Sequence, residues 1–209
     1  MKSQIKKYLM LFALLLLPLS MHAQGKVYTR RIRISDFSVR TTMVTVNPDW
    51  KLCASLREEV VSRWRISSYE FCTPEEYESM KSRSDLYFLN IEESEGICFL
   101  VLCKGGAPKD DDPRKEFFEI VRIPAAASPD AESPYMAAYV DIIQRFVEDA
   151  AQSDKVAYAG LKYYNRPGIG ARPKESYYRV VVGPYVMIIS KEDHKLLLIQ
   201  KRKTNGKAS

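Results

Sequence analysis

The cysteines are the residues of this chain whose spacing could most directly carry redox or metal chemistry. There are four, Cys53, Cys72, Cys98 and Cys103, and the last two lie within the apolar run ICFLVLC at 97–103. If this run is a β-strand, Cys98 and Cys103 point to opposite faces of the sheet, with Cα atoms roughly 16 Å apart at about 3.3 Å per residue. A disulfide needs about 7 Å or less. We therefore expect these two thiols neither to bond to each other nor to share a metal ion, while other disulfides and free thiols both stay open.

Three further patterns resemble catalytic or ion-binding motifs, and each is incomplete. Gly105-Gly106 follows a predicted strand but lacks the lysine and hydroxyl residue of a phosphate-binding loop. Asp110 to Asp112 lack the glycine and the final glutamate of a helix-loop-helix calcium site. Of the two histidines, His22 lies in a segment with the features of a leader, which leaves His194 as the one candidate base. The sequence argues modestly against an enzyme, and we expect no cofactor and no bound metal.

The stretch LKYYNRPGIGARPKESYY at 161–178 combines aromatic and basic residues without apolar periodicity. Such interleaving is typical of surfaces on which bases or sugars stack. The alternative is a long surface loop whose tyrosines pack back onto the domain. The glycines at 168 and 170 lack the third glycine of a dinucleotide-binding fingerprint. The candidate ligand-binding residues are therefore Tyr163, Tyr164, Arg166 and Arg172.

The strands that must position these residues can be predicted from periodicity. Alternation over 26–46 predicts a first strand, with Ile32 and Ile34 on one face and Arg31 and Arg33 on the other. The nearly continuous apolar character of 96–104 predicts a central strand covered on both faces. It is expected to form a hairpin with the strand at 86–92 and to pair with a strand at 116–123. Further strands are predicted at 69–71, 177–189 and 195–200, the second interrupted at Gly183-Pro184.

Helices are predicted where apolar residues recur at steps of three and four. The first begins with Asn47 as its cap and Pro48 in its first turn, and Trp64 at its end is expected to be a core anchor. The second begins with a capping box at 73–76. Its two glutamates complement the helix dipole rather than form an acid–base pair. The third begins at 133–134 and carries an aromatic stripe typical of a core-facing helix.

Together these elements predict an α/β (α+β) fold. We expect a mixed β-sheet packed against about three helices in a single domain. The predicted boundaries are a signal peptide at 1–23, the single α/β domain at 24–200 and a disordered basic tail at 201–209. The oligomeric state stays open.

The first residues predict export. Three lysines precede the short apolar run at 9–17, and small residues follow it, an order typical of a secretory signal peptide. The run is shorter than the about 20 residues of a membrane span, so no stable span is expected after cleavage. Removal of the three lysines lowers the formal charge from +6 to 6 − 3 = +3, which does not demand a nucleic-acid partner. We expect the protein in the periplasm or at the surface of a Gram-negative bacterium.

The leader ending in MHAQ and the stretches LREEVVSRWRISSYEFCTPEEYESM and GICFLVLCKGG resemble exported proteins of gut Gram-negative bacteria. The element order over roughly 27–124 is similar to the amino-terminal α/β domain of TolB-like and CsgG-like envelope proteins. This resemblance implies a module that binds other envelope components, and it carries over no functional residues.

The sequence therefore predicts a non-enzymatic binding or assembly module of the cell envelope, with an envelope protein or a glycan as its partner and no nucleic acid. The alternative is a carbohydrate-binding or polysaccharide-active protein that uses the tyrosine-rich loop at 161–178.

Overall fold

The computed structural model describes residues 29–107, 117–167 and 176–202 of the 209-residue chain. One sheet contains, in spatial order, β2 (Ser68–Cys72), β1 (Thr41–Thr45), β3 (Leu86–Ser94), β4 (Ile97–Lys104) and β5 (Phe118–Ala126). A second sheet contains β6 (Tyr177–Val182), β7 (Tyr185–Ser190) and β8 (Leu196–Lys201). The helices are α2 (Arg30–Arg33), α3 (Lys51–Arg63), α4 (Pro74–Met80), α5 (Met136–Gln152) and α6 (Asp154–Ala159), with 3₁₀ turns η2 (Phe37–Val39) and η4 (Gly160–Tyr164).

The first sheet is mixed, as the sequence predicts. β1 runs parallel to both β2 and β3, whereas β3, β4 and β5 follow one another as antiparallel neighbours. The predicted hairpin of β3 and β4 is confirmed, and so is the pairing of β4 with β5. The α/β fold class with a mixed sheet in a single domain is therefore confirmed. No helix within the described ranges is both long and apolar enough to cross a membrane.

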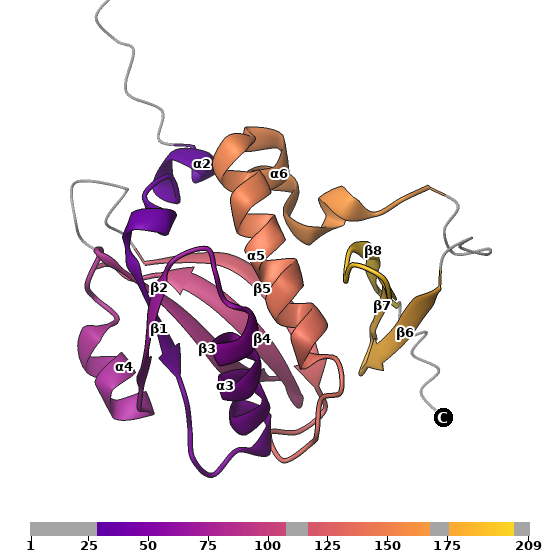
Figure 1. Cartoon of the computed structure of the whole chain (residues 1–209), viewed down its shortest axis with the longest axis horizontal. Helices are drawn as coiled ribbons and strands as arrows, with labels where there is room; N and C mark the ends of the chain where they lie inside the picture. The colour runs from indigo at the N-terminus through magenta and orange to yellow at the C-terminus, as the bar shows by residue number, and fades with distance from the viewer. Residues whose placement is uncertain (1–28, 108–116, 168–175, 203–209) are drawn as a thin grey trace, which may run out of the picture.

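β4 is the central strand, and all eight of its residues are buried. One face of the sheet packs against α3 and α5, which lie side by side over it in Figure 1. Cys103 is on the opposite face, in a smaller cluster with Phe88 that Tyr77 and Met80 of α4 cover. Apolar layers on both faces explain why β4 shows no alternation of polar and apolar residues.

The prediction of a strand over 26–46 is wrong for most of the residues that the structure describes. Arg30–Arg33 form the helix α2, and the strand is limited to Thr41–Thr45. An alternating strand would bury Ile32 and Ile34 together, but Ile32 is 37% exposed and Ile34 is 1% exposed.

Local contacts explain the helical turn. The side chain of Thr29 caps α2 by accepting a hydrogen bond from the Ile32 amide at 3.4 Å. Arg30 and Arg33 each place a guanidinium about 5 Å above the ring of Phe118, at 5.0 and 5.1 Å. These cation–π contacts require two arginines three positions apart to lie on the same side, which a helix provides and a strand does not.

All three predicted helices are present, as α3, α4 and α5. Two of them begin a few residues later than predicted. Asn47 does not cap α3; its side chain accepts a hydrogen bond from the Asp49 amide at 3.0 Å, and the helix begins at Lys51. α5 likewise begins at Met136. Trp64 is buried, which confirms it as a core anchor. Both bonds of the capping box between Thr73 and Glu76 are present.

The C-terminal strands form a sheet of their own, which the sequence did not predict. Tyr178 packs on Tyr135, the residue that precedes α5, with ring centroids 5.3 Å apart, and Tyr185 packs on Phe99 of β4 at 5.7 Å. Figure 1 accordingly places β6, β7 and β8 beside α5, beyond the first sheet. Lys201, where the tail was predicted to begin, is the last residue of β8. The predicted signal peptide and residues 203–209 lie outside the described residues.

A buried charge cluster closes the end of β4. The Lys104 ammonium, on a side chain only 5% exposed, donates to Asp36 Oδ1 at 2.7 Å and to the Arg33 carbonyl at 2.9 Å. The Tyr87 hydroxyl donates to the same Asp36 oxygen at 2.5 Å. Burial alone would raise the pKa of Asp36, but the hydrogen bonds from Lys104 and Tyr87 and the Lys104 charge outweigh it and lower that pKa. The cluster holds η2 against the strand ends.

Replacing Asp36 with asparagine should destabilise the fold by about 3 kcal/mol at neutral pH, because Lys104 would stay buried without its counter-charge. The folded-state pKa of Asp36 lies below its ordinary 3.8, so its stabilisation is present above that value and is lost as the pH falls through the lower folded pKa. The cost of Asp36→Asn should therefore shrink below about pH 4. Urea unfolding at pH 7 and pH 3 measures this. The exposed Asp49→Asn is the matched control, and an equal cost for both variants would contradict the role of the cluster.

All four cysteines are free and buried. Cys98 belongs to the main core and Cys103 to the cluster under α4, which confirms that they point to opposite faces. Burial raises the pKa of Cys98 to about 11 and also raises the pKa of the Cys53, Cys72 and Cys103 thiols.

The thiols should therefore be unreactive in the folded protein and all available after unfolding. We expect no release of thionitrobenzoate from Ellman's reagent by the folded chain at pH 8, because the reactive thiolate is scarce and inaccessible. Unfolding in guanidinium without a reductant should expose all four thiols. A reduced, unfolded sample is the control, and a shortfall of two thiols against it would mean that a disulfide is present.

Candidate functional site

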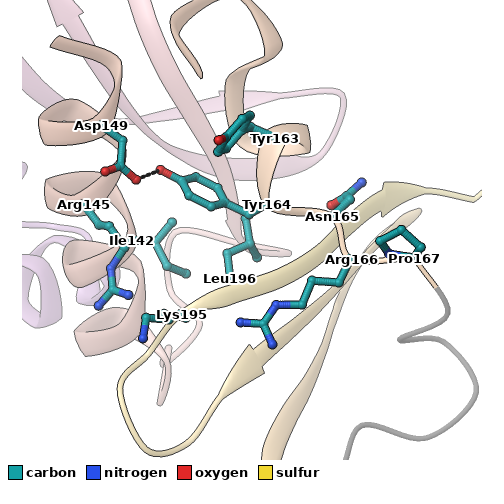
Figure 2. A pocket seen from close by; sticks show the side chains of 10 residues that line it. All are labelled: Ile142, Arg145, Asp149, Tyr163, Tyr164, Asn165, Arg166, Pro167, Lys195 and Leu196. Carbon is teal, nitrogen blue, oxygen red and sulfur yellow. Dashed lines mark hydrogen bonds between the residues drawn. The ribbon is translucent and has the colours of Figure 1, made fainter. Parts of the chain in front are cut away.

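A cavity of about 560 Å³ opens between α5, the η4 turn and the start of β8. Figure 2 shows ten side chains around it, contributed by three parts of the chain that are distant in sequence. They are Ile142, Arg145 and Asp149 from α5, Tyr163, Tyr164, Asn165, Arg166 and Pro167 from η4 and the residues after it, and Lys195 and Leu196 at β8. Its volume suits a small molecule or one or two saccharide units.

The segment after η4 is fixed because it pairs with the open edge of β8. The Asn165 side chain accepts a hydrogen bond from the Ile199 amide at 2.7 Å and donates to the Ile199 carbonyl at 3.0 Å. The Arg166 amide donates to the Leu197 carbonyl at 3.0 Å. These bonds take the place of a neighbouring strand, and they hold Tyr163, Tyr164 and Arg166 at the cavity.

The α5 wall is joined to η4 by a hydrogen bond. The Tyr164 hydroxyl donates to Asp149 Oδ2 at 2.6 Å, and burial together with this carboxylate raises the pKa of Tyr164 above its ordinary value. Tyr163 stands edge-on to Tyr164 with ring centroids 5.5 Å apart, and it is 43% exposed. Tyr164 is thus fixed as part of the cavity wall, whereas the ring of Tyr163 is accessible to a ligand.

Positive charge predominates in the cavity. Among the described residues that line it, Arg145, Arg166 and Lys195 stand against the single carboxylate of Asp149. Figure 2 shows the nitrogen atoms of the three cations at one end and the Asp149–Tyr164 pair at the other. The arrangement can bind a carboxylate or phosphate at the first end and a hydroxyl-bearing ring nearer the tyrosines.

Asp193 forms ion pairs with two of these cations and does not line the cavity. Its carboxylate forms ion pairs with Lys195 and, at 3.8 Å, with Arg145. Burial would raise the pKa of Asp193, but hydrogen bonds from Lys195 and Ser190 outweigh it and lower that pKa to about 2. Asp193 therefore stays ionised at neutral pH and balances part of the charge of these two cations.

The structure brings three of the four predicted site residues together. Tyr163, Tyr164 and Arg166 line one cavity, and Arg172 lies outside the described residues. The other seven residues that line the cavity were not predicted: Ile142, Arg145 and Asp149 on α5, Asn165 and Pro167 after η4, and Lys195 and Leu196 at the start of β8. The α5 residues did carry a signal, because Ile142, Arg145 and Asp149 are spaced by three and four and so share a helix face. No local pattern in the sequence predicts that this face of α5 lies next to η4.

His194 lies in a turn, as predicted, and contacts α5 rather than the cavity. Its Nδ1 lies 2.6 Å from Asp141 Oδ2, the oxygen to which Arg63 also donates at 3.1 Å. This group joins the β7–β8 turn to the two core helices. Among residues 29–107, 117–167 and 176–202, no three histidine, cysteine or acidic side chains are grouped as they would be around a metal ion. Asp110 to Asp112 lie outside these ranges.

Comparison with protein-family models, with curated proteins and with solved structures finds no match for this chain. The interpretation of the cavity therefore rests on its own geometry and charges.

Removing the Tyr164 hydroxyl tests whether the cavity wall is held as described. We expect Tyr164→Phe to lower the free energy of unfolding by about 1.5 kcal/mol, the contribution of a partly buried hydrogen bond to a carboxylate. Urea unfolding followed by circular dichroism measures this. Tyr158→Phe, which changes a 61% exposed ring outside the cavity, should cost less than about 0.5 kcal/mol. Equal effects of the two substitutions would contradict the bond between η4 and α5.

Proposed function

We propose that the protein is a non-enzymatic binding module of the cell envelope and that the cavity beside η4 takes an acidic saccharide. The observation that carries the proposal is the convergence of Arg145, Arg166 and Lys195 next to the exposed ring of Tyr163. An arginine pair matches the planar geometry of a carboxylate, and a tyrosine ring offers an amphipathic surface to a sugar face.

The charges favour a ligand with a carboxylate over a neutral sugar. Each charge-assisted hydrogen bond contributes about 1.5–3 kcal/mol, which corresponds to roughly ten- to hundredfold in affinity. Asp149 at the other end can accept a hydrogen bond from a sugar hydroxyl, since a carboxylate has more than one acceptor site and Tyr164 occupies one. Export, as the leader predicts, would place this site where such glycans occur.

The test is calorimetric binding of tetragalacturonate compared with its methyl ester, which keeps the sugar rings and removes the charge. We expect the ester to bind about tenfold more weakly or worse, and the affinity for tetragalacturonate to fall with added salt. Tyr163→Ala combined with Arg166→Ala should abolish binding, whereas Tyr158→Ala should leave it unchanged. Equal binding of acid and ester, or no effect of the double substitution, would refute the proposal.

A further inference from the structure

The edge of the first sheet at β5 forms a second candidate binding surface, distinct from the cavity beside η4. β5 ends the strand order and pairs with β4 alone among the described strands. In an antiparallel pair, every second residue of an edge strand directs its N–H and C=O away from its neighbour. Such an edge is a template for another strand unless it is short, charged or covered.

A second cavity, of about 710 Å³, follows this edge. It touches residues 119–122 of β5, all four in succession. The register of β5 against β4 shifts at Ile120, but Val121 and Arg122 are in regular register, and their side chains point to opposite faces. A cavity that touches both lies along the backbone edge and not over one face. At about 3.3 Å per residue, this stretch is about 13 Å long. Its far wall is formed by 159–162 at η4 and by 199–201 of β8.

The boundary of the open edge is defined by Pro124. Proline has no N–H to offer an added strand, and it is typical of the point where an edge stops pairing. Every residue from Ile123 to Ala126 is buried, whereas Glu119 is exposed and Arg122 is half-buried. Ile120 and Val121 between them are buried as well, so the part of β5 that the cavity follows is accessible at Glu119 and Arg122.

The walls of this groove are strongly basic. Within the part of the chain that the structure describes, Arg30, Arg122, Lys162 and Lys201 line it against the single carboxylate of Glu119. That carboxylate is already paired, since Arg122 Nε donates to it at 3.1 Å. The lining thus carries a net charge of 4 − 1 = +3. A segment that enters the groove must bring acidic side chains to match it.

We propose that residues 119–122 of β5 bind an extended acidic segment of a partner protein as an added strand. The backbone of that segment forms ladder hydrogen bonds with β5, and its alternate carboxylates contact Arg30, Lys162 and Lys201. This mode of recognition gives affinity through the main chain and selectivity through the flanking side chains.

The probe is an acetylated and amidated hexapeptide of alternating glutamate and valine, titrated into the ¹⁵N-labelled protein. We expect its amide shift changes to centre on 119–122 and its affinity to fall with salt. The same peptide methylated at every backbone nitrogen keeps its charges and loses its N–H donors, so it should bind at least about tenfold more weakly. Equal binding of the two peptides would mean attraction of a polyanion only and would overturn the proposal.

The matched variants separate this groove from the first cavity. Lys162→Glu combined with Lys201→Glu should weaken the hexapeptide at least about tenfold. Arg166→Glu combined with Lys195→Glu makes the same change of charge at the first cavity and should leave hexapeptide binding within about twofold. Loss of binding in both variants, or in neither, would overturn the assignment to β5. Tetragalacturonate binding reports on the first cavity, so failure of one site does not imply failure of the other.

Discussion

The complete burial of β4 is the constraint on which the rest of the structure depends. A strand whose eight residues are all buried needs a partner at each edge and a layer on each face. β3 and β5 supply the edges. α3 and α5 cover one face, and on the other face α4 covers the end at Cys103 while Tyr185 of the second sheet packs on Phe99. Lys104 can belong to such a strand because it is the last residue of β4, where Asp36 accepts a hydrogen bond from its ammonium and balances its charge.

Both candidate sites follow from the way this core is enclosed. Since β4 takes β5 as its outer neighbour, β5 becomes the edge of the first sheet. The second sheet lies beyond that edge. Part of the space between the two sheets is filled by η4, and the residues that follow it, Asn165 and Arg166, pair with β8. One cavity lies on the α5 side of η4 and the other on its β5 side, so Asn165 lines both. Both sites therefore exist because η4 fills only part of the space between the two sheets.

The sequence predicts the parts of this architecture that depend on local pattern. Three elements were predicted from a single local feature each. These features are the apolar run of β4, the capping box at Thr73 and the aromatic stripe of α5. The failure at α2 has a definite reason, because two arginines three apart stack on Phe118, which lies far along the chain. A contact between distant segments can override alternation in a short stretch.

The candidate cavity was predictable only in the part that lies on one stretch of chain. Tyr163, Tyr164 and Arg166 are adjacent in sequence, and their composition indicates binding before any fold is known. Arg145 and Asp149 reach the same cavity because Tyr164 of η4 bonds to Asp149 of α5, and Lys195 reaches it because β8 pairs with Asn165. Each of these placements depends on tertiary packing, which single-sequence periodicity does not encode.

The ion pairs around the two cavities are of the kind that a ligand can replace. Arg145 and Asp193 are each about one-third exposed and lie 3.8 Å apart, and Lys201 lies 3.9 Å from Glu95 at the surface. Exposed pairs of this sort contribute at most about 1 kcal/mol, since solvent screens them. A ligand carboxylate that arrives with its own hydrogen bonds can therefore displace the internal partner at small cost. Buried Lys104 is the contrast within the same chain, because loss of its partner Asp36 leaves a charge with almost no access to water. The physical difference between a structural cation and a binding cation in this protein is thus the exposure of the cation itself, since the side chain of Lys104 is 5% exposed whereas those of Arg145 and Lys201 are 34% and 56% exposed.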